Sequence, residues 1–366
     1  MTLLTREIAE AIVKETMNRL HRNINIMDES GVIIASGDPT RVGERHEGAL
    51  QVVRTGRALI IKQAEANRWP GSRSGINLPI QFQDKIVGVI GITGRPEEVE
   101  EFGGIVKMTT ELMIKQSYLA SQLEWLQHTK EMVIEELIKS QIDHERIDQL
   151  LHMLALKLSP PYQLFLIELK ERTIQNHVLM RQIEQIVGPE RHLIGFVNVH
   201  RLFILLSGLT EERCKDKLLS IANALDHAGL TFRVGCGTEV HEREKISTAY
   251  QEAALALTVG GEGERIILYS DVQTKALIYE MNDEVKQRYI TRIFARTSPK
   301  LIKTLQVFFA CNCNITETAK SLYVHRNTLI YRLKKIKEET GCDPQLFQDA
   351  VSLQMAAWMF EQDTSD

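Results

Sequence analysis

The strongest constraint on the fold is a long stretch, from Gly104 to about Ser159, whose sequence pattern is helical almost throughout. It separates two regions in which short apolar segments alternate with turn residues, as they do in strands. Ser159-Pro160-Pro161 ends the stretch, because proline and the residue before it disfavour helix. A chain of 366 residues also exceeds the usual size of one domain. The sequence therefore predicts several domains joined by helices.

The helical stretch carries an apolar stripe that keeps close to a seven-residue repeat. Its members are Ile105, Met108, Leu112, Leu119, Leu123 and Leu126. Such a repeat suits a helix that packs against a partner helix or against its own domain. A second helix is expected to continue the stripe, with Met132, Val133, Leu137, Ile147, Leu150, Leu151 and Leu154. We therefore expect a homodimer or a higher homo-oligomer.

The region before this stretch has the pattern of an α+β sensor domain of the PAS type. It begins with an amphipathic helix at residues 5–22 and a pair of short strands that turn at Glu29-Ser30-Gly31. A helix at 46–55 follows, and a hairpin that turns at residues 83–85 comes later. Helices that accompany a mostly antiparallel set of strands indicate an α+β layer structure.

The rest of the chain divides into a mixed region and a helical region. Strands interleaved with helices after Pro161 predict a compact α/β module, and the pattern is mostly helical again from Val272. The predicted fold class is thus multidomain α+β with an all-α C-terminal domain. The expected boundaries are 1–125 for the sensor, 126–159 for a helical connector, 160–271 for the middle domain and 272–366 for the C-terminal domain.

The C-terminal region contains the pattern of a helix-turn-helix. A short helix at Thr316–Leu322, with Thr316 as its expected N-cap, is followed by a tight connection and a longer helix at His325–Thr340. Gly341 ends the longer helix. Ala319 allows close approach of the two helices, and one face of the longer helix is apolar, with Leu329, Leu333 and Ile336.

The opposite face of the longer helix is polar and basic. The first turn of a recognition helix reaches base edges, so Arg326 and Asn327 are expected to read guanine and adenine. Arg332, Lys334 and Lys335 are expected to contact phosphates. The alternative is a solvated basic face with no partner. The full set of predicted DNA-binding residues is His325, Arg326, Asn327, Thr328, Tyr331, Arg332, Lys334 and Lys335.

Several segments resemble known families. The block HRNTLIYRL at 325–333 resembles the purine-catabolism-regulator type of helix-turn-helix. The segments RVGERHEGAL at 41–50, GINLPI at 75–80 and VGVIG at 87–91 resemble a sugar diacid recognition domain. Together and in this order they resemble the carbohydrate diacid regulators. The resemblance implies a degenerate GGDEF-like middle domain and activation of sugar-acid catabolic genes, with effectors such as glucarate, galactarate or glycerate.

A sugar acid is an anion rich in hydroxyls, so it needs a cationic anchor, N–H donors and a few polar side chains. Arg41 can hold a carboxylate, and His46 opens a helix whose first amides favour anions. Arg73 and Asn77 flank Gly75-Ile76, where glycine permits close backbone approach. The alternative is that these are ordinary surface and turn residues. The predicted ligand-binding set is Arg41, His46, Gly48, Arg73, Gly75, Ile76 and Asn77, and Arg45 ranks below Arg41.

An enzyme is the main alternative class, because a GGDEF-like domain in other proteins makes cyclic dinucleotides. That chemistry needs acidic residues that hold a metal, and the corresponding hairpin here reads VNVHRL at 197–202. We therefore predict no enzymatic activity, no cofactor and no metal. An RNA- or protein-binding adaptor is a second alternative, but Tyr331 is the one aromatic residue of the basic helix, whereas single-strand binding uses several aromatic residues interleaved with basic ones.

The sequence predicts a cytoplasmic protein. Charged residues interrupt the N-terminus where a signal peptide would be apolar, and no window approaches the ~20 apolar residues of a membrane helix. The formal net charge of -4 does not exclude DNA, because the local clustering of basic residues matters more. The five cysteines are scattered, which predicts small buried thiols rather than disulfides. The expected partners are operator DNA, a hydroxy-acid effector, a second copy of the chain and the transcription machinery.

Overall fold

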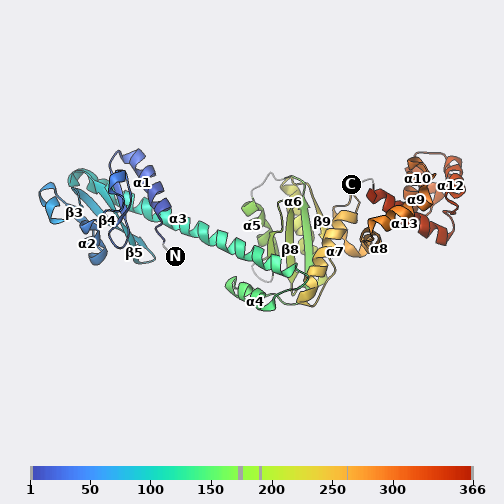
Figure 1. The fold of residues 1–366 in the computed structure, drawn as a ribbon, viewed down its shortest axis with the longest axis horizontal. Helices are drawn as coiled ribbons and strands as arrows, with labels where there is room; N and C mark the ends of the chain where they lie inside the picture. Colours follow the sequence, from blue (N-terminus) through green and yellow to red (C-terminus); the bar gives the residue numbers. More distant parts are fainter. Residues whose placement is uncertain (1–2, 172–175, 189–191, 262, 364–366) are drawn as a thin grey trace. The chain divides into compact units, whose positions relative to one another are not determined.

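A computed structural model describes residues 3–171, 176–188, 192–261 and 263–363. The chain divides into two compact units, Met1–His128 and Thr129–Asp366. The first unit holds a sheet with helices on both faces (Figure 1). Its elements are α1 (Arg6–Leu20), β1 (Ile24–Met27), β2 (Ile33–Ser36), η1 (Pro39–Arg41), α2 (Glu47–Thr55), β3 (Leu59–Ile61), η2 (Gln63–Arg68), β4 (Gly75–Phe82), β5 (Lys85–Thr93) and the first part of α3 (Pro96–Leu137).

The sheet of the first unit is antiparallel, with strand order β2-β1-β5-β4-β3. One face is covered by α1 and α3, where Ile12, Ile90 and Ile114 are buried. The other face packs against α2, through Ala49 and Val52. Because both faces are covered, β4 and β5 are buried along most of their length, as their apolar sequences require.

The apolar stripe of α3 is not part of the buried core of its own domain. Val99, Val106 and Ile114 face the sheet, whereas the seven-residue repeat points to solvent on the other side of the helix. Ile105, Met108, Leu112, Leu119, Leu123 and Leu126 are all exposed. Of the two expected packings, the contact with the same domain is limited to a hollow that Met108, Leu112 and Leu119 line together with Phe82, and a partner helix stays a prediction.

The second helix of the connector begins later than expected. α3 is one helix of 42 residues that ends at Leu137, and α4 (His144–Met153) follows after a short break. Met132, Val133 and Leu137 thus belong to α3. The apolar pattern of the two helices is continuous because both pack on the same sheet of the second unit. Helix ends at Met153, before Ser159-Pro160-Pro161.

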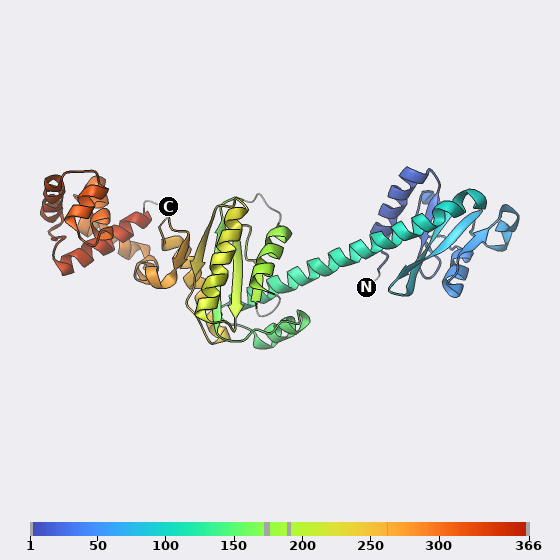
Figure 2. The same cartoon turned by 180° about the vertical axis from the view of Figure 1, so that it is seen from behind.

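The middle part of the chain is a five-stranded sheet between two layers of helices (Figure 2). The strand order is β10-β9-β6-β8-β7, and only the β10–β9 pair is parallel. α5 and α6 cover one face, while α7, α4 and the end of α3 cover the other. The elements are β6 (Tyr162–Leu169), α5 (Asn176–Val187), β7 (His192–Phe196), β8 (Arg201–Ser207), α6 (Glu211–His227), β9 (Phe232–Cys236), η3 (Arg243–Lys245), α7 (Ile246–Val259) and β10 (Ile266–Leu268).

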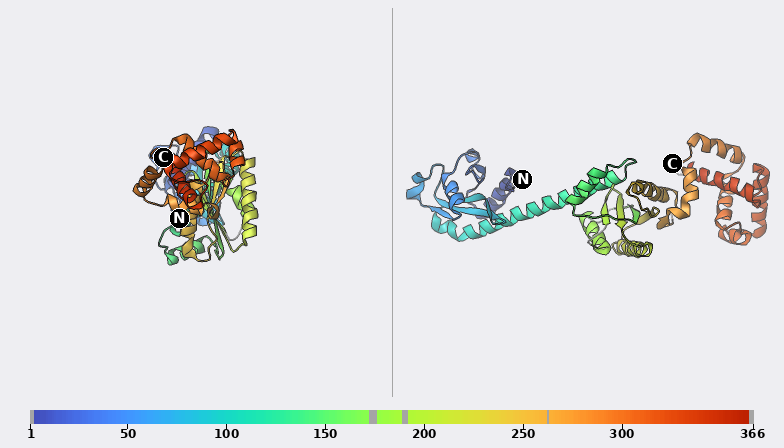
Figure 3. Two further views of the ribbon diagram at one scale, coloured as in Figure 1. Left: turned by 90° about the vertical axis from the view of Figure 1, so that its right-hand side faces the viewer. Right: turned by 90° about the horizontal axis from the view of Figure 1, so that it is seen from below.

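The C-terminal region is entirely helical in its described residues (Figure 3). Its core gathers apolar residues from α9, α10, α12 and α13, including Phe294, Phe308, Leu329 and Ala357. The elements are α8 (Tyr269–Tyr279), α9 (Asp283–Phe294), α10 (Pro299–Ala310), α11 (Ile315–Ser321), α12 (Arg326–Thr340) and α13 (Phe347–Asp363).

Only some of the five cysteines are buried, whereas the sequence predicts buried thiols for all of them. Cys214 and Cys236 are buried, and burial raises the pKa of their thiols to about 11 and about 12. Cys311 and Cys342 are half-buried, and Cys313 is exposed. The expectation of a buried thiol is wrong for Cys313, because it lies in the turn between α10 and α11 with a positive φ of 59°.

Candidate functional site

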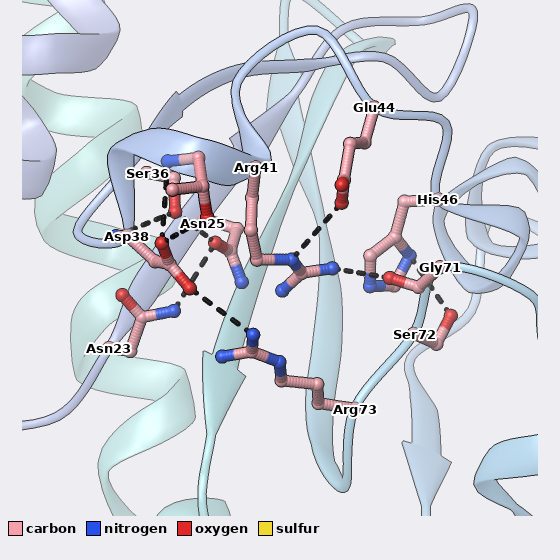
Figure 4. Close-up of polar contacts among 11 residues, drawn as sticks. Asn23, Asn25, Ser36, Asp38, Arg41, Glu44, His46, Gly71, Ser72 and Arg73 are labelled. Atoms are coloured by element: carbon pink, nitrogen blue, oxygen red, sulfur yellow. Dashed lines mark hydrogen bonds and ion pairs between the residues drawn. The ribbon is translucent and has the colours of Figure 1, made fainter.

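A polar pocket lies on the α2 side of the first sheet, where β1, β5 and β4 meet the η1 segment (Figure 4). Six of the seven predicted ligand residues line it, all except Gly48: Arg41, His46, Arg73, Gly75, Ile76 and Asn77. Asn25, Gly91, Ile92 and Thr93 complete the wall. The fold thus brings together residues that are up to 68 positions apart in the sequence, since both Asn25 and Thr93 belong to this wall.

Arg41 is the most unusual residue of the pocket, because its guanidinium group is almost completely buried. The residue is 4% exposed. Its Nη2 donates to the carbonyl oxygen of Gly71, and its Nε lies 3.5 Å from the Glu44 carboxylate. Its Nη1 is buried and has no hydrogen-bond partner within the described residues. A buried charged donor without a partner is costly, so Arg41 is suited to receive an anion.

His46 is the N-cap of α2. Its Nδ1 accepts a hydrogen bond from the Ala49 amide at 3.0 Å, and the residue is 3% exposed. Burial, together with the positive charge of nearby Arg41, lowers the pKa of His46 from 6.5 to about 4. The ring is therefore neutral at pH 7. Because Nδ1 is an acceptor, Nε2 carries the proton and is a hydrogen-bond donor.

The first amides of α2 are already used within the domain. The Gly48 amide donates to Ser72 Oγ at 3.3 Å, and the Glu47 amide donates to the Pro70 carbonyl at 3.2 Å. The expectation that this helix start offers free amides to an anion is therefore wrong. Gly48 instead allows Ser72 to approach the start of α2 closely, since a Cβ on Gly48 would lie 3.0 Å from Ser72 Oγ.

Arg73 lies at the mouth of the pocket and is about half exposed. Its Nη2 donates to Asp38 Oδ2 at 3.2 Å. The other oxygen of Asp38 caps the η1 turn by accepting from the amide and the hydroxyl of Thr40. The hydrogen bond from Thr40 is the main reason that the pKa of Asp38 lies below its ordinary value.

Two buried asparagines flank a glycine on the pocket floor. In the sheet register Gly91 lies between Asn25 and Asn77, which are 2% and 3% exposed. A Cβ on Gly91 would lie 2.9 Å from Asn77 Oδ1, so the glycine leaves space for the amide. Gly75 has a different role: a Cβ there would lie 2.0 Å from the Ile92 carbonyl oxygen, so Gly75 permits the close strand pairing. Sequence reasoning missed Asn25, Asp38 and Ser72.

The second candidate site is the helix-turn-helix. α11 is capped by Asn314, whose side chain accepts from the amides of Thr316 and Glu317 at 2.9 and 3.1 Å. The expected N-cap, Thr316, is wrong because asparagine reaches both amides from two positions earlier. In the turn, the amides of Tyr323 and Val324 bond back to Lys320 and Ala319, with Tyr323 at a φ of 52°. This is a Schellman motif.

α12 begins one residue later than the sequence predicts and ends where it predicts. His325 is its N-cap, with Nδ1 accepting from the Asn327 amide at 3.2 Å, and Gly341 ends it with a φ of 75°. Leu329, Leu333 and Ile336 are buried, as predicted. The candidate DNA-contacting residues that are exposed are His325, Arg326, Asn327, Thr328, Tyr331, Lys334 and Lys335.

Arg332 differs from the other basic residues of α12. It is half-buried, and its Nη1 lies 3.4 Å from Thr304 Oγ1 in α10. It therefore also contributes to the packing of α12 against α10. Lys334 and Lys335 are exposed. Their Nζ atoms form long ion pairs within the helix, at 4.0 Å from Glu338 Oε1 and 3.7 Å from Glu339 Oε1.

The β7–β8 hairpin of the middle domain has the polar but non-acidic turn that the sequence predicts. Asn198 Oδ1 accepts from the amides of His200 and Arg201 and so closes the turn with the chain's own groups. Within the residues that the structure describes, no group of three or more His, Cys, Asp or Glu side chains is placed to hold a metal ion.

A sensor-like domain with a polar pocket, a middle α/β domain and a terminal helix-turn-helix together define a DNA-binding regulator. Family models match in the same order: a sugar diacid recognition domain at residues 4–137, a GGDEF-like domain at 139–259 and a PucR C-terminal helix-turn-helix at 301–359. The carbohydrate diacid regulator of Escherichia coli (strain K12) is 32% identical over 98% of both chains. The chain belongs to the family of carbohydrate diacid regulators, and it is a transcriptional regulator rather than an enzyme.

Two other relatives are more distant. The purine catabolism regulatory protein of Bacillus subtilis (strain 168) is 58% identical over 41 residues, which are 11% of this chain and 8% of that protein. The regulator of polyketide synthase expression from Bifidobacterium adolescentis has a TM-score of 0.33 and 18% identity, covering 65% of this chain and 93% of that chain. A likeness this low supports no structural argument. Among the described helices, none has the length and apolarity needed to cross a membrane.

Proposed function

We propose that this protein activates genes of sugar-acid catabolism when a small hydroxy acid, such as glucarate, galactarate or glycerate, binds the pocket of its first domain. The observation that carries the proposal is the buried Nη1 of Arg41, which lacks a partner in the described part of the chain and belongs to a polar pocket. The name of the E. coli relative, a carbohydrate diacid regulator, supports an acid of this class.

The pocket offers the groups that a hydroxy acid needs. Arg41 supplies a charge-assisted donor for a carboxylate. Neutral His46 supplies an N–H donor, and the amides of Asn25 and Asn77 suit hydroxyl groups.

Thermal unfolding of the full chain with a panel of hydroxy acids and diacids tests this function. A ligand that binds only the folded state raises the unfolding temperature by mass action. Arg41→Ala should weaken binding of the identified acid by about 1.5–3 kcal/mol, the usual contribution of a charge-assisted hydrogen bond. Arg45→Ala is the matched control, because Arg45 is exposed in the same loop. Equal affinity of both variants and the parent would place the site elsewhere.

We infer that α12 is the recognition helix, which reads operator DNA. Arg326 and Asn327 would reach base edges from its first turn, with His325, Thr328 and Tyr331 beside them. Lys334, Lys335 and Arg332 would contact phosphates. Recruitment of the transcription machinery is part of the same proposal, as is a location in the cytoplasm.

We propose that the first domain is a PAS-like sensor and that the middle domain couples it to the DNA-binding domain without turnover. The antiparallel five-stranded sheet with helices on both faces supports the first proposal. The alternative is a cyclase-like signalling enzyme, which lacks support because the β7–β8 turn has no acidic pair. Incubation with GTP and magnesium, followed by chromatography, should give no cyclic product.

We also propose that the protein is a homodimer or a higher homo-oligomer whose seam includes the exposed stripe of α3. Ile105, Leu112, Leu119 and Leu126 follow one another at intervals of seven and are all exposed. The division into 1–125, 126–159, 160–271 and 272–366 remains our proposal for the functional parts. In it the 126–159 connector is also part of the middle core, through Val133 and Ile147.

A further inference from the structure

Each of the two arginines of the pocket is held by a carboxylate of the chain itself. Glu44 lies 3.5 Å from Arg41 Nε, and Asp38 lies 3.2 Å from Arg73 Nη2 (Figure 4). Both carboxylates belong to the loop between β2 and α2, and both side chains are partly exposed. Arg41 and Arg73 line the same pocket.

The charges around the pocket therefore balance before any ligand arrives. Arg41 and Arg73 contribute two positive charges, and Asp38 and Glu44 contribute two negative charges. His46 is neutral at pH 7, because its pKa is about 4. A sugar diacid would bring two more carboxylates. Four carboxylates facing two arginines in a partly buried site would repel one another, so the ligand can bind well only if the chain's own carboxylates move away.

We propose that Asp38 and Glu44 are internal competitors of the effector, and that a diacid is recognised because it replaces both of them. One carboxylate of the diacid takes Arg41 from Glu44, and the other takes Arg73 from Asp38. This inference rests on the proposed function, in which the same pocket binds the effector.

Arg41 is the anchor for the first carboxylate. Its Nη1 is buried without a partner in the described chain, and Glu44 touches only Nε. Nη1 is therefore the donor of Arg41 that Glu44 leaves to a ligand carboxylate. Glu44 is about half exposed, so water can solvate it when it is displaced.

Arg73 determines whether a second carboxylate is recognised. It is more exposed than Arg41, and its one ion pair among the described residues is with Asp38. A monoacid of the same length has a hydroxyl at the far end, and this hydroxyl cannot replace Asp38 as the counterion of Arg73. The preference for a diacid over the matching monoacid is thus assigned to the Asp38–Arg73 pair.

Calorimetry on the full chain tests the assignment with two pairs of ligands, glucarate against gluconate and galactarate against galactonate. Arg73→Gln should weaken binding of the preferred diacid about tenfold and leave the matching monoacid unchanged. Asp38→Asn removes the competing charge but keeps the oxygen that caps Thr40. It should strengthen diacid binding about two- to fivefold, the range expected for an exposed ion pair, without helping the monoacid.

Asp28→Asn is the matched control for Asp38→Asn. Asp28 caps the turn between β1 and β2 by accepting from the amides of Ser30 and Val32, and it makes no ion pair in the described part of the chain. Thermal unfolding of each variant without ligand establishes that it folds.

Two results would overturn the inference alone: Arg73→Gln weakens diacid and monoacid equally or neither, or Asp38→Asn binds as Asp28→Asn does. If the parent protein binds none of the four acids or the wider hydroxy-acid panel, the proposed function fails, and this inference fails with it.

Discussion

His46 links the stability of the first domain to pH. A histidine whose pKa is lower in the folded state binds a proton more readily when unfolded, so folding opposes its protonation. The stability due to neutral His46 is fully present above pH 6.5 and is lost as the pH falls toward 4. We therefore predict that the unfolding temperature of the full chain falls across this range.

His46→Asn should flatten the fall, because asparagine is a good N-cap that does not titrate. Calorimetric scans of the parent and the variant between pH 4 and 7.5 provide the comparison. If both lose the same stability over this range, the titrating group is not His46.

Tyr323 occupies a strained backbone position in the turn between α11 and α12. It has a φ of 52° and is 96% exposed, so no packing of its ring offsets the strain. Tyr323→Gly should stabilise the folded state by about 0.5–1 kcal/mol, because glycine adopts this conformation without steric cost. Denaturant unfolding measures the change, and Tyr331→Gly is the control, since glycine inside α12 should destabilise by about 1 kcal/mol. Tyr323→Gly with lower stability than the parent contradicts the argument.

At the residue scale, the sequence identifies the charged part of the pocket more readily than its neutral part. Arg41 and His46 stand out because charge and helix-capping patterns are local. Asn25 could not be placed, because its role depends on the pairing of β1 with β5, some 66 positions away. Asp38 has a local pattern as the cap of Thr40, but its pairing with Arg73 depends on the folded loop.

At the element scale, the end of a helix at a glycine is predicted well, whereas the cap of α11 and the buried end of α3 are not. Gly341 ends α12 as the sequence indicates, and His325 caps its start one residue before the helix begins. α5 is one of the helices expected among the strands after Pro161, and its buried Leu179, Met180, Ile183 and Val187 follow helical spacing. The end of α3 at Leu137 cannot be predicted from the apolar pattern. The same sheet buries residues of α3 and of α4, so the pattern continues across the break between the two helices.

The base contacts and the phosphate contacts expected of α12 can be distinguished by how DNA affinity depends on salt concentration. Arg326→Ala or Asn327→Ala should lose about 1–3 kcal/mol on the specific operator and relax specificity at one or two base pairs. Lys335→Ala should weaken specific and non-specific DNA alike and lower the salt slope by about one. Fluorescence anisotropy on operator and scrambled duplexes over a salt series measures both effects.

Lys300→Ala in α10 is a suitable control for the loss of a positive charge, because Lys300 is exposed outside the helix-turn-helix. Parent-like binding of Arg326→Ala and Asn327→Ala to both duplexes would refute the assignment of α12 as the recognition helix.

For the whole molecule, the α3 stripe predicts self-association. Leu112→Lys with Leu119→Lys should shift the protein toward monomer, because two lysines would replace apolar contacts in the seam. Glu124→Lys adds positive charge at an exposed position outside the seam and should leave the assembly intact. Light scattering, with and without operator DNA, distinguishes the two variants. A parent protein that is monomeric in both conditions rules out the seam.

α3 belongs to two hydrophobic cores, since Val106 and Ile114 are buried in the first unit and Val133 and Leu137 in the second. A helix advances by about 100° per residue, so each residue removed between Ile114 and Val133 rotates one set of buried side chains on the surface of α3 relative to the other by that angle. Removing seven residues nearly restores the angle between the two sets, whereas removing five changes it by about 140°. The number of residues between the two buried sets thus fixes which faces of α3 they occupy, and a deletion of seven residues there should disturb regulation less than a deletion of five.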